Sequence, residues 1–110
     1  MTSVFRLKAG FYAKGHSGYS DAGSDIVCAA VSALTQGAIG GMQRFGVRCK
    51  VYVDDEKGVL CAKVIDERPG KAAIAHVLIE SMFHSLKDIQ RQFPRNLRII
   101  SCDGGVTNDS

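Results

Sequence analysis

The chain has 110 residues, of which 45% are hydrophobic and 23% charged, and its formal net charge is +3. These are ordinary values for a small globular domain, and they exclude disordered and collagen-like proteins. A chain of this length buries roughly two thirds of its unfolded surface, so it needs neither a metal nor a disulfide to hold a core. We expect a single domain over residues 1–103 and a flexible tail at 104–110.

Basic residues are scattered along the chain. The densest group is Arg91, Arg95 and Arg98, which the pattern places at the solvated end of a helix. Nucleic-acid-binding proteins typically cluster far more lysine and arginine. The first ten residues lack the hydrophobic core of a signal peptide, and no run approaches transmembrane length. We expect a cytoplasmic protein that acts without a membrane and does not require direct contact with nucleic acid.

The four cysteines and three histidines show no metal-binding pattern, because no C-x-x-C pair or ligand spacing occurs among them. We therefore expect no metal and no cofactor. Cys49, Cys61 and Cys102 each lie in a segment with strand-like composition, where a free cysteine most often serves as a small buried hydrophobe. Cys28 differs because it lies at a predicted helix start.

The first half of the chain predicts a strand, a glycine-rich loop and a helix. Residues 4–12 alternate, and the set Phe5, Leu7, Ala9 and Phe11 is expected to face the core. A loop follows over residues 13–24. The helix is expected to begin at Ser24 or Asp25, both good N-caps, and to run to Arg44 with Gly46 as its terminator.

The second half predicts a hairpin over residues 47–54 and 59–65, a helix from 71 or 72 to 93, and a strand over 97–102. The element order is strand, helix, strand, strand, helix, strand. It predicts an α+β two-layer sandwich with both helices packed on a small mixed sheet, compatible with a ferredoxin-like topology. The second helix carries more apolar surface than a narrow stripe, which either fills the core or forms a symmetric dimer, and we favour the dimer.

Nucleophilic chemistry is indicated by Cys28 at the start of the first helix. Exposed N–H groups and the positive end of the helix dipole favour a thiolate there, and a histidine within reach would hold it as an ion pair. His16 lies twelve positions upstream in the glycine-rich loop. A twelve-residue loop can span roughly 40 Å, so the sequence does not force the two side chains together.

The same segment resembles a known family signature. Its diagnostic residues are Gly15-His16, the small residue Ser17, Gly23, and the run from Asp25 to Leu34. Together they are similar to the signature of the ribosomal-processing cysteine proteases. The resemblance implies a cytoplasmic, homodimeric, metal-free endopeptidase that removes a short N-terminal extension from a large-subunit ribosomal protein, and that cuts beside aromatic residues. It assigns the nucleophile to Cys28 and the base to His16.

Four further residues match the pattern as supporting or substrate-binding positions: Gly15, Ser17, Asp25 and Ser32. If Asp25 is the N-cap, its carboxylate bonds the Cys28 amide; alternatively it orients the imidazole. Ser32 either bonds the Cys28 carbonyl within the helix or lines the substrate pocket.

Other functions stay open on the sequence alone. A noncatalytic ribosome-associated binding module would use the mild positive charge and the flexible loop. An acylphosphatase-like enzyme fits the element order but would require an arginine-containing phosphate loop, which is missing before the first helix. A thiol redox role would use an activated Cys28, although no resolving cysteine is near it in sequence.

Overall fold

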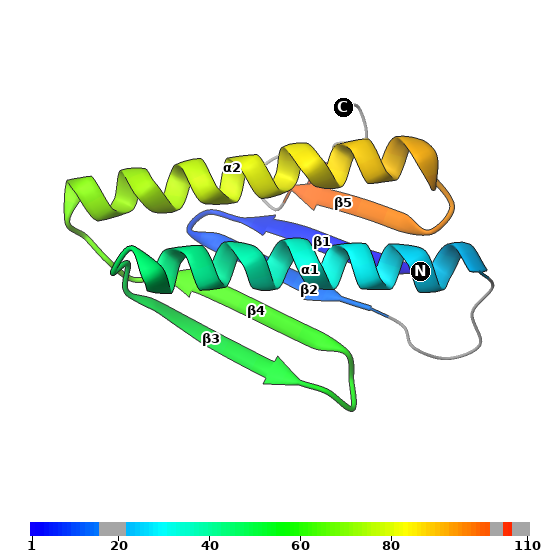
Figure 1. Cartoon of the computed structure of the whole chain (residues 1–110), viewed down its shortest axis with the longest axis horizontal. Coiled ribbons are helices and arrows are strands. Elements are labelled where there is room, and N and C mark those ends of the chain that lie inside the picture. The colour runs from blue at the N-terminus through cyan, green and yellow to red at the C-terminus, as the bar shows by residue number, and fades with distance from the viewer. Residues whose placement is uncertain (16–21, 102–104, 107–110) are drawn as a thin grey trace.

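The computed structural model describes residues 1–15, 22–101 and 105–106. Its elements in chain order are β1 (Thr2–Leu7), β2 (Gly10–Lys14), α1 (Ala22–Arg44), β3 (Cys49–Asp54), β4 (Val59–Val64), α2 (Pro69–Gln92), β5 (Leu97–Ser101) and β6 (Gly105–Val106). The strands form one sheet in the order β3-β4-β2-β1-β5-β6, in which β1 and β5 are parallel and the other neighbours antiparallel. Both helices lie side by side on one face of this sheet (Figure 1). The predicted two-layer α+β sandwich with a mixed sheet is confirmed.

The segment predicted as one strand over residues 4–12 is a hairpin, β1 and β2, with a turn at Lys8 and Ala9. The turn changes which positions face the helices, because Phe5 pairs with Tyr12 and Val4 with Ala13. Val4 and Phe11 are consequently buried under the helices. The expectation that Phe5 shares the core face with Phe11 is wrong. The apolar alternation continues through the turn, so the sequence pattern does not reveal that the chain reverses there.

The end of α1 follows the predicted chemistry. Gly46 adopts a positive φ of 74°, which favours glycine. Its N–H donates to Gln43 O at 3.1 Å, and the Val47 N–H donates to Met42 O at 2.8 Å. These two bonds make a Schellman motif, and the buried side chains of Met42 and Val47 provide its hydrophobic contact. The prediction that Gly46 terminates this helix is confirmed.

The core lies between the helices and the sheet. α2 begins at Pro69 rather than at 71 or 72, because proline suits the first helical position, where its missing N–H is no loss. Its buried stripe consists of Ala75, Ile79, Met82, Phe83 and Leu86. Facing it across the core are buried residues of α1 and the strands, among them Val27, Val31, Met42, Val4, Phe11, Ala62, Leu97 and Ile99.

One stretch of the described chain, Ile26–Arg44 in α1, is long and apolar enough to cross a membrane by length and composition, with a mean hydropathy of 1.3. The expectation that no run approaches transmembrane length is therefore wrong. The stretch is apolar because Val27, Val31, Ala38 and Met42 fill the protein's own core. A core helix passes the same test as a membrane span, so this feature alone does not indicate a membrane protein.

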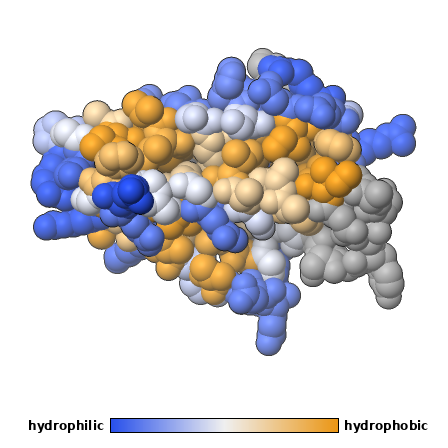
Figure 2. All heavy atoms as spheres, in the orientation of Figure 1, coloured by the Kyte–Doolittle hydropathy of each residue, from blue (hydrophilic) through white to orange (hydrophobic). Residues whose placement is uncertain are grey.

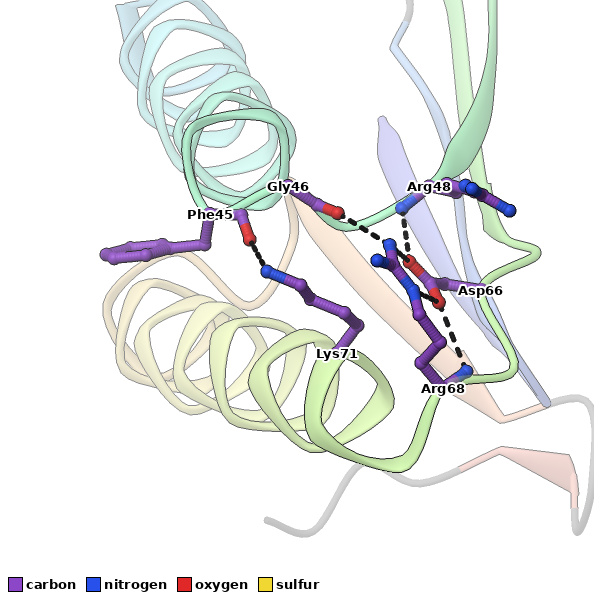
Figure 3. Close-up of polar contacts among 6 residues, drawn as sticks. All are labelled: Phe45, Gly46, Arg48, Asp66, Arg68 and Lys71. Atoms are coloured by element: carbon purple, nitrogen blue, oxygen red, sulfur yellow. Dashed lines mark hydrogen bonds and ion pairs between the residues drawn. The ribbon is translucent and has the colours of Figure 1, made fainter.

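The end of the molecule at the C-terminus of α1 is fixed by a polar clamp centred on Asp66 (Figure 3). The Asp66 carboxylate is 1% exposed and accepts hydrogen bonds from the N–H of Arg48, at 2.9 Å, and from the guanidinium and N–H of Arg68. Arg68 also donates to the Gly46 carbonyl at 3.1 Å. The guanidinium of Arg68 holds the pKa of Asp66 well below its ordinary value, although burial opposes this. The clamp joins α1, β3 and α2.

The C-terminal segment contains a short strand that pairs with the sheet. Gly105–Val106 forms β6, which pairs antiparallel with Ile100 and Ser101 at the end of β5. This part of the predicted tail at 104–110 is thus a strand. Cys102 and residues 107–110 lie outside the described residues, and the division at residue 103 stays a prediction.

Candidate active site

Cys28 lies in the second turn of α1, because the helix begins at Ala22. The expectation that it occupies the first turn is therefore wrong. Its amide is inside the hydrogen-bonded part of the helix, so it is not one of the free N–H groups that would favour a thiolate or hold an oxyanion. The side chain itself is half-buried.

The thiol of Cys28 lines a pocket of about 310 Å³ between α1 and the β3–β4 hairpin. Its lining residues come mostly from the end of β2, the first half of α1 and the β3–β4 hairpin, and Figure 1 shows how these elements are arranged. Its walls combine apolar side chains with hydroxyls and two carboxylates. The lining residues are Thr2, Ala13, Gly15, Cys28, Val31, Ser32, Thr35, Gln36, Val53, Asp54, Asp55, Gly58, Val59 and Leu60.

Thr2 provides the polar contact of the cysteine. Its Oγ1 lies 3.4 Å from the Cys28 Sγ, and either atom can be the donor. The threonine is only 4% exposed, and its N–H donates to the Asn96 carbonyl at 3.0 Å, which fixes the start of β1. Sequence reasoning missed Thr2, because nothing in the sequence indicates that the second residue meets the twenty-eighth.

Gly15, the residue after β2, lies next to the Cys28 thiol. A Cβ built on this glycine would lie 3.9 Å from the Cys28 Sγ and 3.9 Å from the Thr2 Oγ1. The Gly15 N–H donates to the Gly58 carbonyl at 2.9 Å. Gly15, predicted as a supporting residue, is therefore brought against Cys28 by the fold.

Gly58 holds Gly15 in place from the β3–β4 turn. It adopts a φ of 65°, and a Cβ added there would lie 2.6 Å from the Gly15 carbonyl oxygen. Its own N–H donates to the Asp55 carbonyl at 3.3 Å. Only glycine fits this close approach with that backbone conformation. The sequence indicated a turn at 55–58 but not the strand end that it contacts.

The other predicted site residues differ in what the structure describes. His16 and Ser17 lie outside the described residues. Asp25 is the fourth residue of α1, so it is not the N-cap that the sequence suggested, and its side chain also lies outside the described part. Ser32 is exposed and lines the pocket one turn after Cys28, which favours the second of its two predicted roles.

The charged residues that line this pocket are Asp54 and Asp55. Asp54 is engaged within the turn, where its carboxylate accepts from the Lys57 N–H at 3.1 Å and from the Tyr52 hydroxyl at 3.4 Å. Among residues 1–15, 22–101 and 105–106, no three His, Cys, Asp or Glu side chains are grouped to hold a metal ion.

The arrangement therefore combines a half-buried thiol, a hydroxyl beside it and an open pocket. Comparison with known proteins decides what it is: residues 5–98 match the family model described as cysteine protease Prp. The chain belongs to the cysteine protease Prp family. A curated relative, the ribosomal processing cysteine protease Prp of Bacillus subtilis (strain 168), is 30% identical over 91 residues, which cover 81% of each chain. Membership in the Prp family confirms both the resemblance and the prediction of a cysteine protease.

Solved structures show the same fold. A crystal structure of Prp from S. aureus in complex with a substrate peptide has a TM-score of 0.80 and 21% identity, covering 92% of this chain and 99% of that chain. Another, with a covalently linked product peptide, has a TM-score of 0.72 and 22% identity over 91% and 96%. SMU.848 from Streptococcus mutans has a TM-score of 0.73 and 20% identity over 91% and 90%.

Proposed function

We propose that this Prp-family protein is an endopeptidase that removes a short N-terminal extension from a large-subunit ribosomal protein, with Cys28 as nucleophile and His16 as base. The observation that carries the proposal is the position of the Cys28 thiol, at the wall of a pocket of about 310 Å³ and directly against Gly15. The B. subtilis relative is described as ribosomal processing. The S. aureus protein binds a substrate peptide and links a product peptide covalently.

Chain connectivity supports the choice of His16. His16 follows Gly15 directly in the sequence. Gly15 in turn lies against the Cys28 sulfur. The choice of His16 as the base is therefore supported by its place in the chain next to a residue that lies against the nucleophile.

The reaction would proceed by covalent catalysis. His16 accepts the Cys28 thiol proton, and the sulfur attacks the scissile carbonyl carbon to form a tetrahedral intermediate. His16 then donates its proton to the leaving amine as the C–N bond breaks, which leaves an acyl group on the sulfur. Water, activated by the same imidazole, releases the acyl group and restores the thiol. The Thr2 hydroxyl is placed to donate to the sulfur between these steps.

The decisive experiment uses a ribosomal protein that carries the extension, with cleavage followed by intact mass. Cys28→Ala and His16→Ala should each fold and lose cleavage. Cys61→Ala is the matched control, because Cys61 lies on the opposite face of the sheet and should leave cleavage unchanged. Full cleavage by Cys28→Ala would overturn the proposal. Salt-sensitive ribosome binding that is indifferent to Cys28 would instead support the noncatalytic binding module.

We also propose that the protein acts in the cytoplasm as a homodimer. Exposed apolar side chains gather over the end of α1 and the first half of α2 (Figure 2). They surround a shallow hollow of about 370 Å³ lined by Phe45, Ala73, Ile74, Val77 and Leu78. Val77 is 64% exposed and Phe45 52%. Val77→Glu should convert a dimer to a monomer in sedimentation equilibrium, and an unchanged mass would exclude this surface.

A further inference from the structure

The face of the sheet opposite the helices is uncovered in the described part of the chain (Figure 1). Side chains alternate along each strand, so the residues next to the buried ones point to this open face. Val4, Phe11 and Ile99 are buried under the helices. Phe5, Tyr12 and Ile100 therefore point the other way.

The strand register aligns apolar and aromatic residues in one row across the open face. Tyr52 is opposite Cys61, Cys61 opposite Tyr12, Tyr12 opposite Phe5, and Phe5 opposite Ile100. The Phe5 and Tyr12 rings meet edge to face, with centroids 5.6 Å apart. Tyr52, at the free edge, is 58% exposed. The row thus crosses five strands, with Phe5 and Tyr12 half-buried and Tyr52 exposed.

Basic side chains flank this row on both sides. Lys50 and Lys63 lie directly opposite each other on β3 and β4. On the other side of the aromatic row, Lys14 on β2 and Arg98 on β5 both lie opposite Ser3 of β1. All four are exposed.

Two lysines directly opposite each other repel, which costs stability unless an anion lies between them. No ion pair of Lys50 or Lys63 is found in the described part of the chain. The acidic residue on the strands of this face is Asp54, which is already bound to the Lys57 N–H and to the Tyr52 hydroxyl. The open face is therefore aromatic at its centre and positively charged at its flanks.

We propose that this open face binds single-stranded RNA. Unpaired bases would stack on the aromatic rings of this row, Tyr52 first, and the phosphates on either side would meet Lys50 and Lys63 or Lys14 and Arg98. A duplex fits poorly, because its bases are stacked on each other and hidden from a flat sheet. The inference is independent of the proposed proteolysis, because neither the residues of the aromatic row nor the four cations line the Cys28 pocket.

A second copy of the chain fits this face less well than an anionic partner. Packing two open faces together would bring the same four cations near each other with Asp54 as their counter-charge. Lys50 by itself would be explained as protection of the exposed edge strand β3. That explanation does not extend to Lys63, because β4 lies inside the sheet between β3 and β2.

The test measures binding of a fluorescein-labelled 12-nucleotide single-stranded RNA by anisotropy, with the full chain, between 50 and 200 mM salt. The double variant Lys50→Gln and Lys63→Gln should weaken binding about tenfold and flatten the log–log salt slope by about 1.4, because each lost phosphate contact removes about 0.7. Tyr52→Leu should weaken binding roughly fivefold or more while leaving that slope unchanged, since stacking releases no counterions.

The matched control is Lys87→Gln with Arg44→Gln, which removes two positive charges from the helices. It should change the dissociation constant less than twofold, and all three variants should keep the peptide cleavage of the unmodified chain. Equal weakening by the control would overturn the proposal, because binding would then follow net charge alone. Equal affinity for a duplex of the same length would also overturn it, as would a sheet-to-sheet dimer that Tyr52→Leu dissociates.

Discussion

The hydroxyl of Thr2 lies 3.4 Å from the sulfur of Cys28, although 26 positions separate the two residues. The contact exists because the start of β1 runs beneath the start of α1. It gives the cysteine a hydrogen-bonding partner that is nearly excluded from solvent. A hydroxyl in this position can donate to a thiolate, and a hydrogen bond to a charged group is worth more than one between neutral groups.

Thr2→Val should therefore lower kcat/KM for peptide cleavage about tenfold, because valine keeps the shape but cannot donate to the sulfur. The rate of Cys28 alkylation by iodoacetamide at pH 7 should fall in parallel. Thr2→Ser keeps the hydroxyl and should restore most of both rates. If Thr2→Val cleaves as fast as the unmodified protein, the contact has no role in the reaction.

Gly58→Ala should impair the site and the fold together. The new Cβ would lie 2.6 Å from the Gly15 carbonyl oxygen, and the φ of 65° would strain any L residue. We expect a loss of about 1–2 kcal/mol from the backbone conformation alone, measured by urea unfolding. Cleavage should fall further than stability explains, because Gly15 leads directly into His16.

Gly46→Ala is the matched comparison, since Gly46 has a similar φ of 74°. It lies eighteen residues after Cys28, just beyond the end of α1, so it is roughly 25 Å away. This variant should lose a similar amount of stability, about 1–2 kcal/mol, yet keep kcat/KM when folded. Equal loss of cleavage in both variants would show that the effect is not specific to Gly15.

Asp66→Asn should reduce stability at pH 7 and change its dependence on pH. The native pKa of Asp66 lies below the unfolded value of about 3.9, so the carboxylate contributes its full stability above that pH. The contribution is lost as the pH falls through the native pKa. The difference in unfolding free energy between the two proteins should therefore shrink from pH 5 to pH 2, in urea titrations.

Asp88→Asn controls for the loss of a carboxylate. Asp88 pairs with Arg91 on the surface of α2, where both side chains are more than half exposed. Removing it should change the unfolding free energy by less than about 1 kcal/mol at pH 7. A larger loss than in Asp66→Asn would contradict the assignment of the clamp as the stabilising contact.

Burial raises the pKa of the Cys49 thiol, so it should stay protonated and react slowly at neutral pH. Peptide mapping after brief iodoacetamide treatment at pH 7 should find Cys28 labelled well before Cys49. Labelling of Cys49 should increase as the pH is raised towards 10. Preferential labelling of Cys49 at pH 7 would contradict its burial at the start of β3.

Local sequence patterns determined most of the fold. The period-two alternation at 47–54, the turn at 55–58 and the glycine at 46 each describe interactions between near neighbours, and the structure contains all three features. The same patterns failed at residues 4–12. A two-residue turn there leaves the alternation of apolar and polar residues unbroken, but it changes which residues face the helices. They also failed at the start of α1, where Ser24 and Asp25 look like caps but lie inside the helix.

By itself, the sequence determined the candidate nucleophile, its resemblance to the processing proteases and the layered α+β class, since these depend on residue identity and short-range periodicity. Only the tertiary structure decided what surrounds Cys28. Thr2 and Gly15 lie against the sulfur, and Gly58 contacts Gly15. These residues come from different strands and turns, and the register of the sheet brings them together. The row from Tyr52 to Ile100 and the paired lysines beside it depend on the same register, because hydrogen bonds between strands, not sequence spacing, set which residues are opposite each other.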